Sequence, residues 1–151
     1  MNNDYRIEPC ELNHFYDLKA RAYDEQMLSL IDSKEFLQQY VSKSYAFTGF
    51  YRNDIIGIAG ILPMWPGVAE AWMFLGNDLY KHRRFVYKQV KEHLNEVFNL
   101  LKIKRLQLVC QANFNKAHCF AEHLGFVKEA FMKNYGLDGS DFLLYARIKN
   151  D

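Results

Sequence analysis

The fold is most clearly encoded in residues 115–148, NKAHCFAEHLGFVKEAFMKNYGLDGSDFLLYARI. Asn115 is placed to cap a helix, and Gly125 stands where a left-handed C-terminal cap belongs. Between them apolar residues recur at helical spacing, at Ala117, Phe120, Ala121 and Leu124. The segments 127–135 and 142–148 are typical of strands, and the intervening GLDGSD is a turn by composition. The stretch therefore predicts a helix that ends at Gly125, followed by a closing pair of strands.

Upstream of this stretch, the sequence predicts a hairpin, two further strands and a long helix. The expected strands are 44–51, 55–62, 69–75 and 104–110. Asn53-Asp54 is a candidate for the tight turn of the hairpin, and PMWPG interrupts the chain at 63–67. The clearest helix covers residues 81–101, where apolar side chains step by three or four along one face.

The first forty residues predict a short opening strand, 5–8, and two helices. ELNHFYDLKARAY, residues 11–23, has the spacing of one continuous helix. Asp32, with Glu35 three residues later, forms a capping-box pattern at the start of the second helix. The predicted order is β α α β β β α β α β β. We therefore expect a single α/β (α+β) domain over residues 1–151, with a mixed, mostly antiparallel sheet flanked by helices.

Composition narrows the function classes. The formal net charge is only +1, from 19 basic and 18 acidic residues, so nucleic-acid binding has little support. The three cysteines are odd in number and lie in apolar contexts, which favours free buried thiols in a reducing compartment. No signal peptide is visible, and no apolar run approaches about 18 residues. A cytoplasmic protein without a membrane segment is expected.

The closing half, 115–148, and the hairpin YRNDIIGIAGI resemble the GCN5-related N-acetyltransferase (GNAT) superfamily. The resemblance covers most of the chain from about Tyr45 onward. It implies transfer of an acetyl group from acetyl-CoA to an amine. AWMFLGND and HRRFVYK further resemble a divergent branch of tailed bacteriophages, whose members include internal virion and head-morphogenesis proteins. That branch implies an alternative function: a structural, assembly or host-interaction protein that does not bind coenzyme A. Such a protein would lie in the host cytoplasm or the virion. A homodimer is also possible.

The segment LGNDLYKHRRFVYKQV, residues 75–90, departs from the family pattern. Active members have an Arg/Gln-x-x-Gly-x-Gly/Ala loop here, whose glycines let backbone N–H groups approach the coenzyme pyrophosphate. His82 falls at the Arg/Gln position, and Phe85 and Tyr87 fall at the glycines. Either the neighbouring cationic side chains bind the pyrophosphate instead, or this is a solvated helix start that has lost the coenzyme. The second hypothesis is favoured because phosphate binding at helix termini needs close backbone approach.

The resemblance implies contacts with acetyl-CoA at the end of the fourth strand, at the following helix start and before the last helix. The residues at these positions are Phe74, Leu75, Lys81, His82, Arg83, Arg84, Phe85, Val86, Asn113 and Asn115. The two asparagines are alternatives for one role, and neither fits the family spacing cleanly.

Acetyl transfer needs a base for the ammonium proton and a donor for the leaving thiolate. Glu70 is the candidate base, although an exposed carboxylate near a strand start is the simpler interpretation. The usual acid is a tyrosine on the last helix, but Ala121 stands there. Tyr135 and Tyr145 are possible substitutes, and each is otherwise a packed aromatic residue.

Other polar groups carry weaker signals. The spacing of Cys110, His118, Cys119 and His123 matches no standard set of zinc ligands, so no metal is expected. Cys119 and His123 lie one helical turn apart and could pair as nucleophile and base, but a buried cysteine beside a surface histidine is the simpler interpretation. Trp65 and Trp72 are expected in the core, and an exposed aromatic patch around Trp65 would favour the scaffold alternative.

Overall fold

A computed structural model describes residues 4–30 and 33–150 and divides the chain into two compact units. Unit 1 comprises Met1–Leu62 and Trp72–Val97, and unit 2 comprises Pro63–Ala71 and Phe98–Asp151. The chain therefore crosses between the units three times, twice within the hairpin of the third and fourth strands. The expectation of one domain over residues 1–151 stays a prediction.

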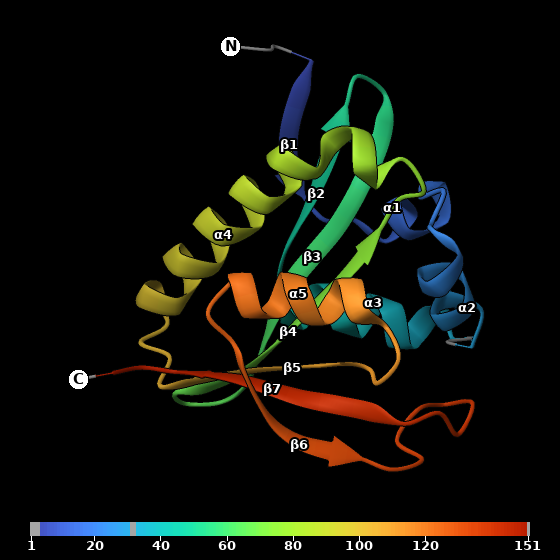
Figure 1. The fold of residues 1–151 in the computed structure, drawn as a ribbon. Coiled ribbons are helices and arrows are strands. Elements are labelled where there is room, and N and C mark those ends of the chain that lie inside the picture. The colour runs from blue at the N-terminus through green and yellow to red at the C-terminus, as the bar shows by residue number, and fades with distance from the viewer. Residues whose placement is uncertain (1–3, 31–32, 151) are drawn as a thin grey trace. The chain divides into compact units, whose positions relative to one another are not determined.

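The elements follow the expected order with one additional helix (Figure 1). They are β1 (Tyr5–Pro9), α1 (Leu12–Asp17), α2 (Ala22–Leu30), α3 (Lys34–Lys43), β2 (Tyr45–Tyr51), β3 (Asp54–Trp65), β4 (Val68–Leu75), the 3-10 turn η1 (Leu79–His82), α4 (Arg83–Leu100), β5 (Arg105–Gln111), α5 (Asn115–His123), β6 (Val127–Met132) and β7 (Phe142–Ile148). The strand order is β1-β2-β3-β4-β5-β7-β6, in which β4 and β5 pair in parallel. The pairs β1–β2, β2–β3, β5–β7 and β6–β7 are antiparallel. The mixed α+β class predicted from the sequence is confirmed.

Unit 1 packs helices on both faces of its strands. Phe15 of α1 and Leu37 of α3 are buried with Ile58 on one face. Val86 of α4 is buried with Ile56 and Leu75 on the other face. Ile56 and Ile58 point to opposite faces because a bulge interrupts the β2–β3 register between Ile55 and Gly57.

Unit 2 confirms the prediction for its closing half. The Phe126 N–H donates to the Ala121 carbonyl at 3.1 Å, and the Gly125 N–H donates to the Glu122 carbonyl at 3.0 Å. Gly125 has φ of 90°, so these bonds form the left-handed C-terminal cap that the Leu-Gly-Phe sequence predicts. β6 and β7 then pair antiparallel, as expected, although β6 already ends at Met132.

The continuous helix predicted for residues 11–23 is wrong. α1 ends at Asp17, Leu18 is extended, and α2 begins only at Ala22. The residues between the helices bond to the end of β4 instead of continuing a helical turn. The Asn77 N–H donates to the Lys19 carbonyl at 2.8 Å, so tertiary hydrogen bonds outweigh the helical spacing of this segment.

Two predicted helix caps also differ. Asp32 lies outside the described residues, and Ser33 is the N-cap of α3, accepting from the Phe36 N–H at 3.1 Å. Asn115 is the first residue of α5 rather than its cap. Phe114 is the N-cap and makes no side-chain cap hydrogen bond.

The β2–β3 turn is displaced from its predicted position, and the interruption expected at residues 63–67 is confined to the last residues of that stretch. The β2–β3 turn is Arg52-Asn53, with Arg52 at φ of 55°, one residue earlier than expected. β3 continues through the PMW segment to Trp65, and Gly67, at φ of 87°, makes the turn into β4. Trp65 is consequently 59% exposed, so its expected place in the core is wrong, whereas Trp72 packs against Phe15. No helix among residues 4–30 and 33–150 is long and apolar enough to cross a membrane.

Candidate functional site

Glu70 lies on β4 in unit 2, where the parallel pair aligns it with Gln107 of β5. Its carboxylate accepts a hydrogen bond from the Gln107 side chain. Partial burial raises the pKa of Glu70, and the Gln107 bond opposes that rise. Because the Gln107 amide that opposes the rise is neutral, burial leaves Glu70 with an increased proton affinity.

Tyr135 lies in the turn after β6, also in unit 2, and its ring centroid is 5.4 Å from that of Phe142. Partial burial raises the pKa of its hydroxyl, and the negative charge of Glu70 raises this pKa further. The phenol therefore stays protonated at neutral pH and can donate. The structure brings Glu70 and Tyr135 within electrostatic reach of each other, with Tyr135 52% exposed.

The turn that carries Tyr135 is fixed by hydrogen bonds on either side of it. The Asn134 N–H donates to Asp141 Oδ1 at 2.9 Å, and the Gly136 N–H donates to the Ser140 carbonyl at 2.9 Å. A Cβ at Gly136 would meet the Phe142 ring at 2.8 Å, so the close return of the chain here requires glycine. Tyr135 is thus presented by an ordered turn.

Tyr145, the other candidate acid, lies on the opposite face of the strands of unit 2. β7 aligns it with Leu108, whereas Glu70 is aligned with Gln107. Consecutive residues of β5 point to opposite faces, so Glu70 and Tyr145 are separated by the sheet. Tyr145 is 2% exposed and its ring stacks on His118 at 5.8 Å.

His118 also contacts Cys110, a pair that the sequence spacing did not single out. Cys110 Sγ lies 3.3 Å from His118 Nδ1, and His118 Nε2 lies 2.8 Å from the Ala112 carbonyl. The carbonyl must accept from Nε2–H, so Nδ1 accepts from the thiol. Burial raises the pKa of Cys110 to about 11, which keeps the thiol protonated. The pair is a packed donor and acceptor, not an activated nucleophile.

The remaining cysteine and histidine on α5 do not form the nucleophile–base pair that their spacing left open. Cys119 is exposed, which contradicts the expected burial of this thiol, and His123 Nδ1 lies 2.6 Å from the Cys119 carbonyl oxygen. In the described part of the chain, no three His, Cys, Asp or Glu side chains are placed to hold a metal ion.

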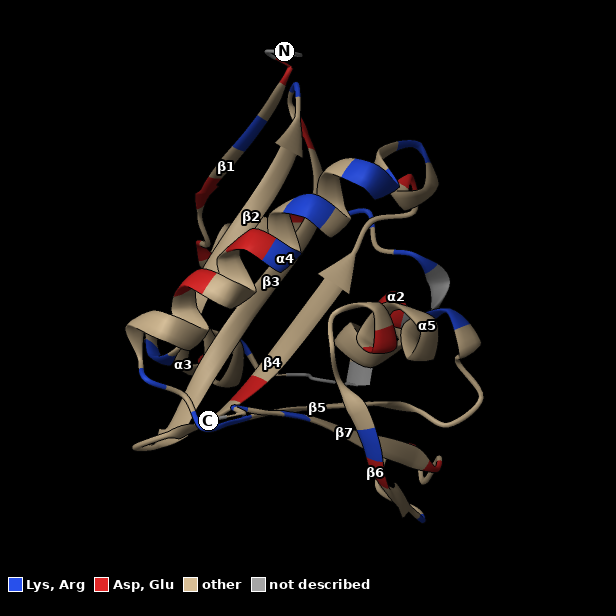
Figure 2. Cartoon of the chain, turned by 60° about the vertical axis from the view of Figure 1, so that its left-hand side comes forward, with Lys and Arg blue, Asp and Glu red and all other residues tan. Residues whose placement is uncertain are grey.

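The expected coenzyme contacts at the start of α4 lie in unit 1. The 3-10 turn η1 stands where the family has its glycine loop, and Asp78 precedes it. Arg83 and Arg84 are exposed in the first turn of α4, and Figure 2 shows the basic residues gathered toward this end of the helix. Phe85 stacks on Tyr5 with ring centroids 4.2 Å apart. The bulky side chain at the first glycine position is therefore directed into packing with β1.

The end of β4 is bonded to other segments of unit 1. The Leu75 N–H donates to Asp24 Oδ2 at 3.0 Å, and the Leu75 carbonyl accepts from the Arg21 N–H at 3.0 Å. Asp24 is 2% exposed and forms a close ion pair with Arg21. Burial raises the pKa of Asp24, and the charge and hydrogen bonds of Arg21 oppose that rise. The backbone of Leu75 is therefore engaged within the chain, and Phe74 packs against Phe15.

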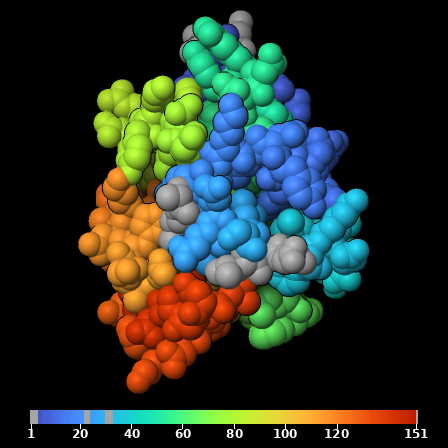
Figure 3. Space-filling view, turned by 90° about the vertical axis from the view of Figure 1, so that its right-hand side faces the viewer, coloured from blue at the N-terminus to red at the C-terminus, as the bar shows by residue number. Residues whose placement is uncertain are grey.

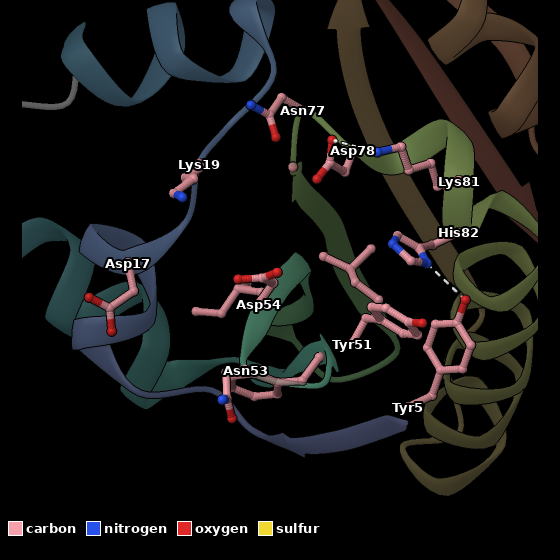
Figure 4. Close-up of a pocket in the computed structure, with 14 residues that line it drawn as sticks. Tyr5, Asp17, Lys19, Tyr51, Asn53, Asp54, Asn77, Asp78, Lys81 and His82 are labelled. Atoms are coloured by element: carbon pink, nitrogen blue, oxygen red, sulfur yellow. Dashed lines mark hydrogen bonds and ion pairs between the residues drawn. The ribbon is translucent and has the colours of Figure 1, made fainter. Parts of the chain in front are cut away.

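A pocket of about 550 Å³ lies in unit 1 (Figure 4). Its lining comes from the β2–β3 turn, the chain after α1 and the segment from Gly76 to His82. The same segments, coloured green, blue and yellow-green, gather on the face seen in Figure 3. His82 is turned toward two aromatic residues: its Nδ1 lies 2.8 Å from the Tyr5 hydroxyl, and its ring centroid lies 4.7 Å from that of Tyr51. Lys81 is paired with Asp78 at 4.0 Å.

The two candidate asparagines lie in unit 2. Asn113 and Asn115 are both exposed at the start of α5. Val86, by contrast, is 7% exposed and belongs to the core of unit 1.

Three residues that the sequence did not single out, Arg105, Gln107 and Glu129, form a connected group in which Gln107 is aligned with Glu70. Arg105 Nε lies 3.1 Å from Gln107 Oε1, and the Arg105 guanidinium binds Glu129 through two nitrogens. A signal was present, since Arg105 and Gln107 alternate with apolar residues along a predicted strand and so must share its polar face.

Comparison with solved structures identifies the fold. A spermidine N-acetyltransferase SpeG chimera from Vibrio cholerae and hSSAT matches with a TM-score of 0.74 at 14% identity, over 97% of this chain and 96% of that one. The ribosomal alpha-N-protein acetyltransferase RimL in complex with coenzyme A matches with a TM-score of 0.69 at 15% identity, over 97% and 95%. A GNAT family acetyltransferase from Elizabethkingia anophelis with acetyl-CoA bound gives 0.71 at 16% identity, over 98% and 100%.

No protein-family model matches the sequence, and no curated protein matches it. At this low identity the structural likeness establishes the GNAT fold, as the sequence resemblance implied, and the fold alone does not fix the chemistry.

Proposed function

We propose that the chain is an acyl-CoA-dependent N-acyltransferase that transfers an acetyl group from acetyl-CoA to an amine. The observation that carries the proposal is the partly buried Glu70 on β4: burial raises its pKa, the neutral Gln107 side chain opposes that rise, and its charge acts on Tyr135. The solved structures of the same fold support it, since they are a spermidine N-acetyltransferase, an alpha-N-protein acetyltransferase with coenzyme A and a GNAT family acetyltransferase with acetyl-CoA.

In this mechanism Glu70 accepts a proton from the acceptor's ammonium group, directly or through a water molecule. The free amine then attacks the thioester carbonyl, so that a C–N bond forms and the C–S bond breaks. Tyr135 donates its hydroxyl proton to the departing sulfur, and the second proton lost from nitrogen restores the phenol. The raised pKa of Glu70 brings its proton affinity closer to that of the ammonium group, which favours this transfer at neutral pH.

The residues expected to hold acetyl-CoA fit it only in part. Arg83 and Arg84 offer exposed charge at a helix start, which suits a pyrophosphate. The Leu75 N–H is already bonded to Asp24, and the Asp78 carboxylate at the start of η1 opposes an anion. The proposal therefore includes weak coenzyme binding that depends on side-chain charge.

Turnover tests the proposal. We expect release of free thiol from acetyl-CoA with at least one amine from a panel of polyamines, amino acids and peptides. Glu70→Gln should lower turnover on the order of 10²–10⁴-fold with little change in acetyl-CoA affinity, because the carboxylate acts on the acceptor's proton. Glu122→Gln, an exposed carboxylate of α5 in the same unit, is the matched control and should retain activity. Equal turnover by the Glu70→Gln variant and wild type would remove Glu70 from the mechanism.

A protein-binding scaffold is the second candidate, favoured by the exposed side chains of Trp65 (59%) and Met64 (42%) beside the β3–β4 turn. Its phage origin and its homodimer remain sequence-based hypotheses, as does a cytoplasmic or virion location; none of the three solved structures compared above is described as a phage protein. Calorimetry with acetyl-CoA separates the candidates. No binding even at low salt, together with self-association that is lost in a Trp65→Ser variant, would favour the scaffold.

A further inference from the structure

A chain of hydrogen bonds in unit 2 leads from an exposed ion pair to Glu70. Arg105 Nη1 and Nη2 donate to the two carboxylate oxygens of Glu129 at 3.0 and 2.6 Å. Arg105 Nε donates to Gln107 Oε1 at 3.1 Å. The parallel pairing of β4 and β5 aligns Gln107 with Glu70, and hydrogen bonding by the Gln107 side chain lowers the pKa of the Glu70 carboxyl. One guanidinium therefore serves two acceptors, using its planar edges for both.

The contact with Arg105 decides which end of the Gln107 amide faces Glu70. A glutamine amide has one accepting oxygen and one donating NH2 group, which lie on opposite sides of the same carbon. Because Arg105 can only donate, it holds the oxygen, and the NH2 group is left for the carboxylate. A flipped amide would place its oxygen against Glu70 and lose both hydrogen bonds.

We propose that Arg105, held by Glu129, is a positioning residue that fixes the Gln107 amide with its NH2 group toward Glu70. Arg105 does not contact Glu70 itself in this arrangement. Its action passes through Gln107, and the bidentate pair with Glu129 holds the guanidinium in the orientation that Gln107 requires.

The backbone of unit 2 is built for this arrangement. Arg105 and Gln107 are two residues apart on β5 and so share one face. Glu129 sits at a register shift of β6, between Lys128, which pairs with Tyr145, and Ala130, which pairs with Leu144. Glu129 is the extra residue of this bulge, and bulges re-aim a side chain relative to a regular strand. The bulge therefore supplies the partner that orients Arg105.

In the described part of unit 2, two side chains interact with the Glu70 carboxylate, and an ion pair lies beyond one of them. Gln107 donates to Glu70 from β5, and the charge of Glu70 interacts with Tyr135 in the turn after β6. Arg105 and Glu129 lie beyond Gln107 and carry opposite charges. A direct field effect and a positioning effect of this ion pair therefore make different predictions for each substitution.

The experiment is an NMR titration of the Glu70 side-chain carboxyl in protein labelled with ¹³C-glutamate, assigned by loss of its signal in Glu70→Gln. Gln107→Leu removes the donor and should raise the pKa of Glu70. Arg105→Lys keeps the positive charge but cannot hold both Glu129 and Gln107. We expect it to raise the pKa of Glu70 as well, because the Gln107 amide becomes free to turn.

Glu129→Gln gives the sharpest distinction. If the pair acted only through its field, removal of a negative charge would lower the pKa of Glu70. Positioning predicts the opposite, since a loosened Arg105 no longer fixes Gln107, and the pKa of Glu70 rises. A pKa of Glu70 that is unchanged or lowered in both Arg105→Lys and Glu129→Gln would overturn the proposal. Backbone amide spectra of each variant show that the fold is retained.

The inference rests on the proposed function only for its effect on turnover. If Glu70 is the base, kcat/KM of Arg105→Lys at a fixed acidic pH should fall roughly 2- to 12-fold, the range that one ordinary hydrogen bond corresponds to. A titration that shifts without any turnover in wild type would leave the positioning role intact and refute the enzyme. A titration that does not shift would refute the positioning role, whatever the turnover.

Discussion

In unit 1 the carboxylate of Asp24 is bonded to the Arg21 guanidinium and to the Leu75 N–H, whereas in unit 2 the carboxylate of Glu70 is bonded to the neutral amide of Gln107. Burial raises the pKa of both carboxyl groups. For Asp24 the Arg21 guanidinium and the Leu75 N–H oppose the effect, whereas for Glu70 the neutral Gln107 side chain opposes it. Two acidic residues that both experience burial, but have different partners, are thus suited to different tasks.

The comparison separates a structural carboxylate, Asp24, from Glu70, the carboxylate proposed to accept a proton. Asp24 is a structural group, since it ties the segment after α1 to the end of β4. Glu70 has a perturbed pKa and an incomplete set of partners, which is what a proton-transfer group requires. The same contrast applies to the proposed enzyme. Its proposed base, Glu70, is not tied to a cation by an ion pair that the structure describes, whereas the Leu75 N–H at one expected coenzyme contact is bonded to Asp24. The substitutions below test this contrast, in order of decreasing effect.

After the loss already expected for Glu70→Gln, the largest effect is expected at the phenol of Tyr135. Tyr135→Phe should lower turnover about 10²-fold, the lower end of general acid catalysis, because the hydroxyl that donates to the leaving sulfur is lost. Tyr145→Phe, on the opposite face of the sheet, should change turnover less than about threefold. Steady-state kinetics of the two variants make the comparison. A larger loss with Tyr145→Phe would reverse the assignment of the acid.

The next effect concerns the structural carboxylate. Asp24→Ala leaves the buried Leu75 N–H without its acceptor and should lower the free energy of unfolding by about 1–3 kcal/mol. Asp17→Ala, an exposed aspartate of α1, should change stability by less than about 0.5 kcal/mol. Urea denaturation measures both. If Asp24→Ala also abolished turnover while remaining folded at the assay temperature, Asp24 would have a role in the reaction and the contrast with Glu70 would fail.

A smaller effect is expected for coenzyme binding at the start of α4. Arg83→Ala with Arg84→Ala should weaken acetyl-CoA binding about 3- to 10-fold at low salt, as two exposed charges near a helix terminus do. The affinity of wild type should itself fall with salt, since side-chain charge acts through an attraction screened over about 8–10 Å. Lys88→Ala with Lys91→Ala, further along the helix, is the control. Calorimetry that shows tight, salt-insensitive binding in the Arg variant would mean that backbone amides hold the pyrophosphate.

Most of the fold follows from local sequence chemistry, and the exceptions have tertiary causes. The Leu-Gly-Phe exit of α5 could be predicted because its cap is made by residues within one turn of each other. The break between α1 and α2 could not, because Lys19 and Arg21 bond to Asn77 and Leu75, more than 50 positions away. Hydrophobic spacing alone carries no information about such partners.

The candidate site shows the same division. Glu70 could be proposed from its strand position, but its pairing with Gln107 depends on the parallel register of β4 and β5. The sequence places Phe85 at a glycine position of the family pattern, and only the structure shows that its ring stacks on Tyr5. The role of Glu129 depends on a bulge in β6, which no pattern of residue types announces.

The smallest effect is expected for Glu70→Gln, which should increase the free energy of unfolding at neutral pH. A carboxyl group whose pKa is raised by folding contributes stability below its unfolded pKa, and this contribution is lost as pH rises through the folded pKa. Glu70 is such a group, so wild type should lose stability over that range. Glu70→Gln removes the ionisation but can still bond to Gln107. The variant should match wild type near pH 4 and be more stable at pH 7 by about 1 kcal/mol, the scale of one stabilising substitution at a functional site.

Glu129→Gln should behave in the opposite way, because Arg105 lowers the pKa of Glu129. The contribution of Glu129 to stability is therefore present at neutral pH and lost as pH falls. Thermal unfolding at the two pH values measures both differences. A Glu70→Gln variant that is less stable than wild type at pH 7 would show that the carboxylate holds the fold together, and Glu70 would then resemble Asp24 rather than contrast with it.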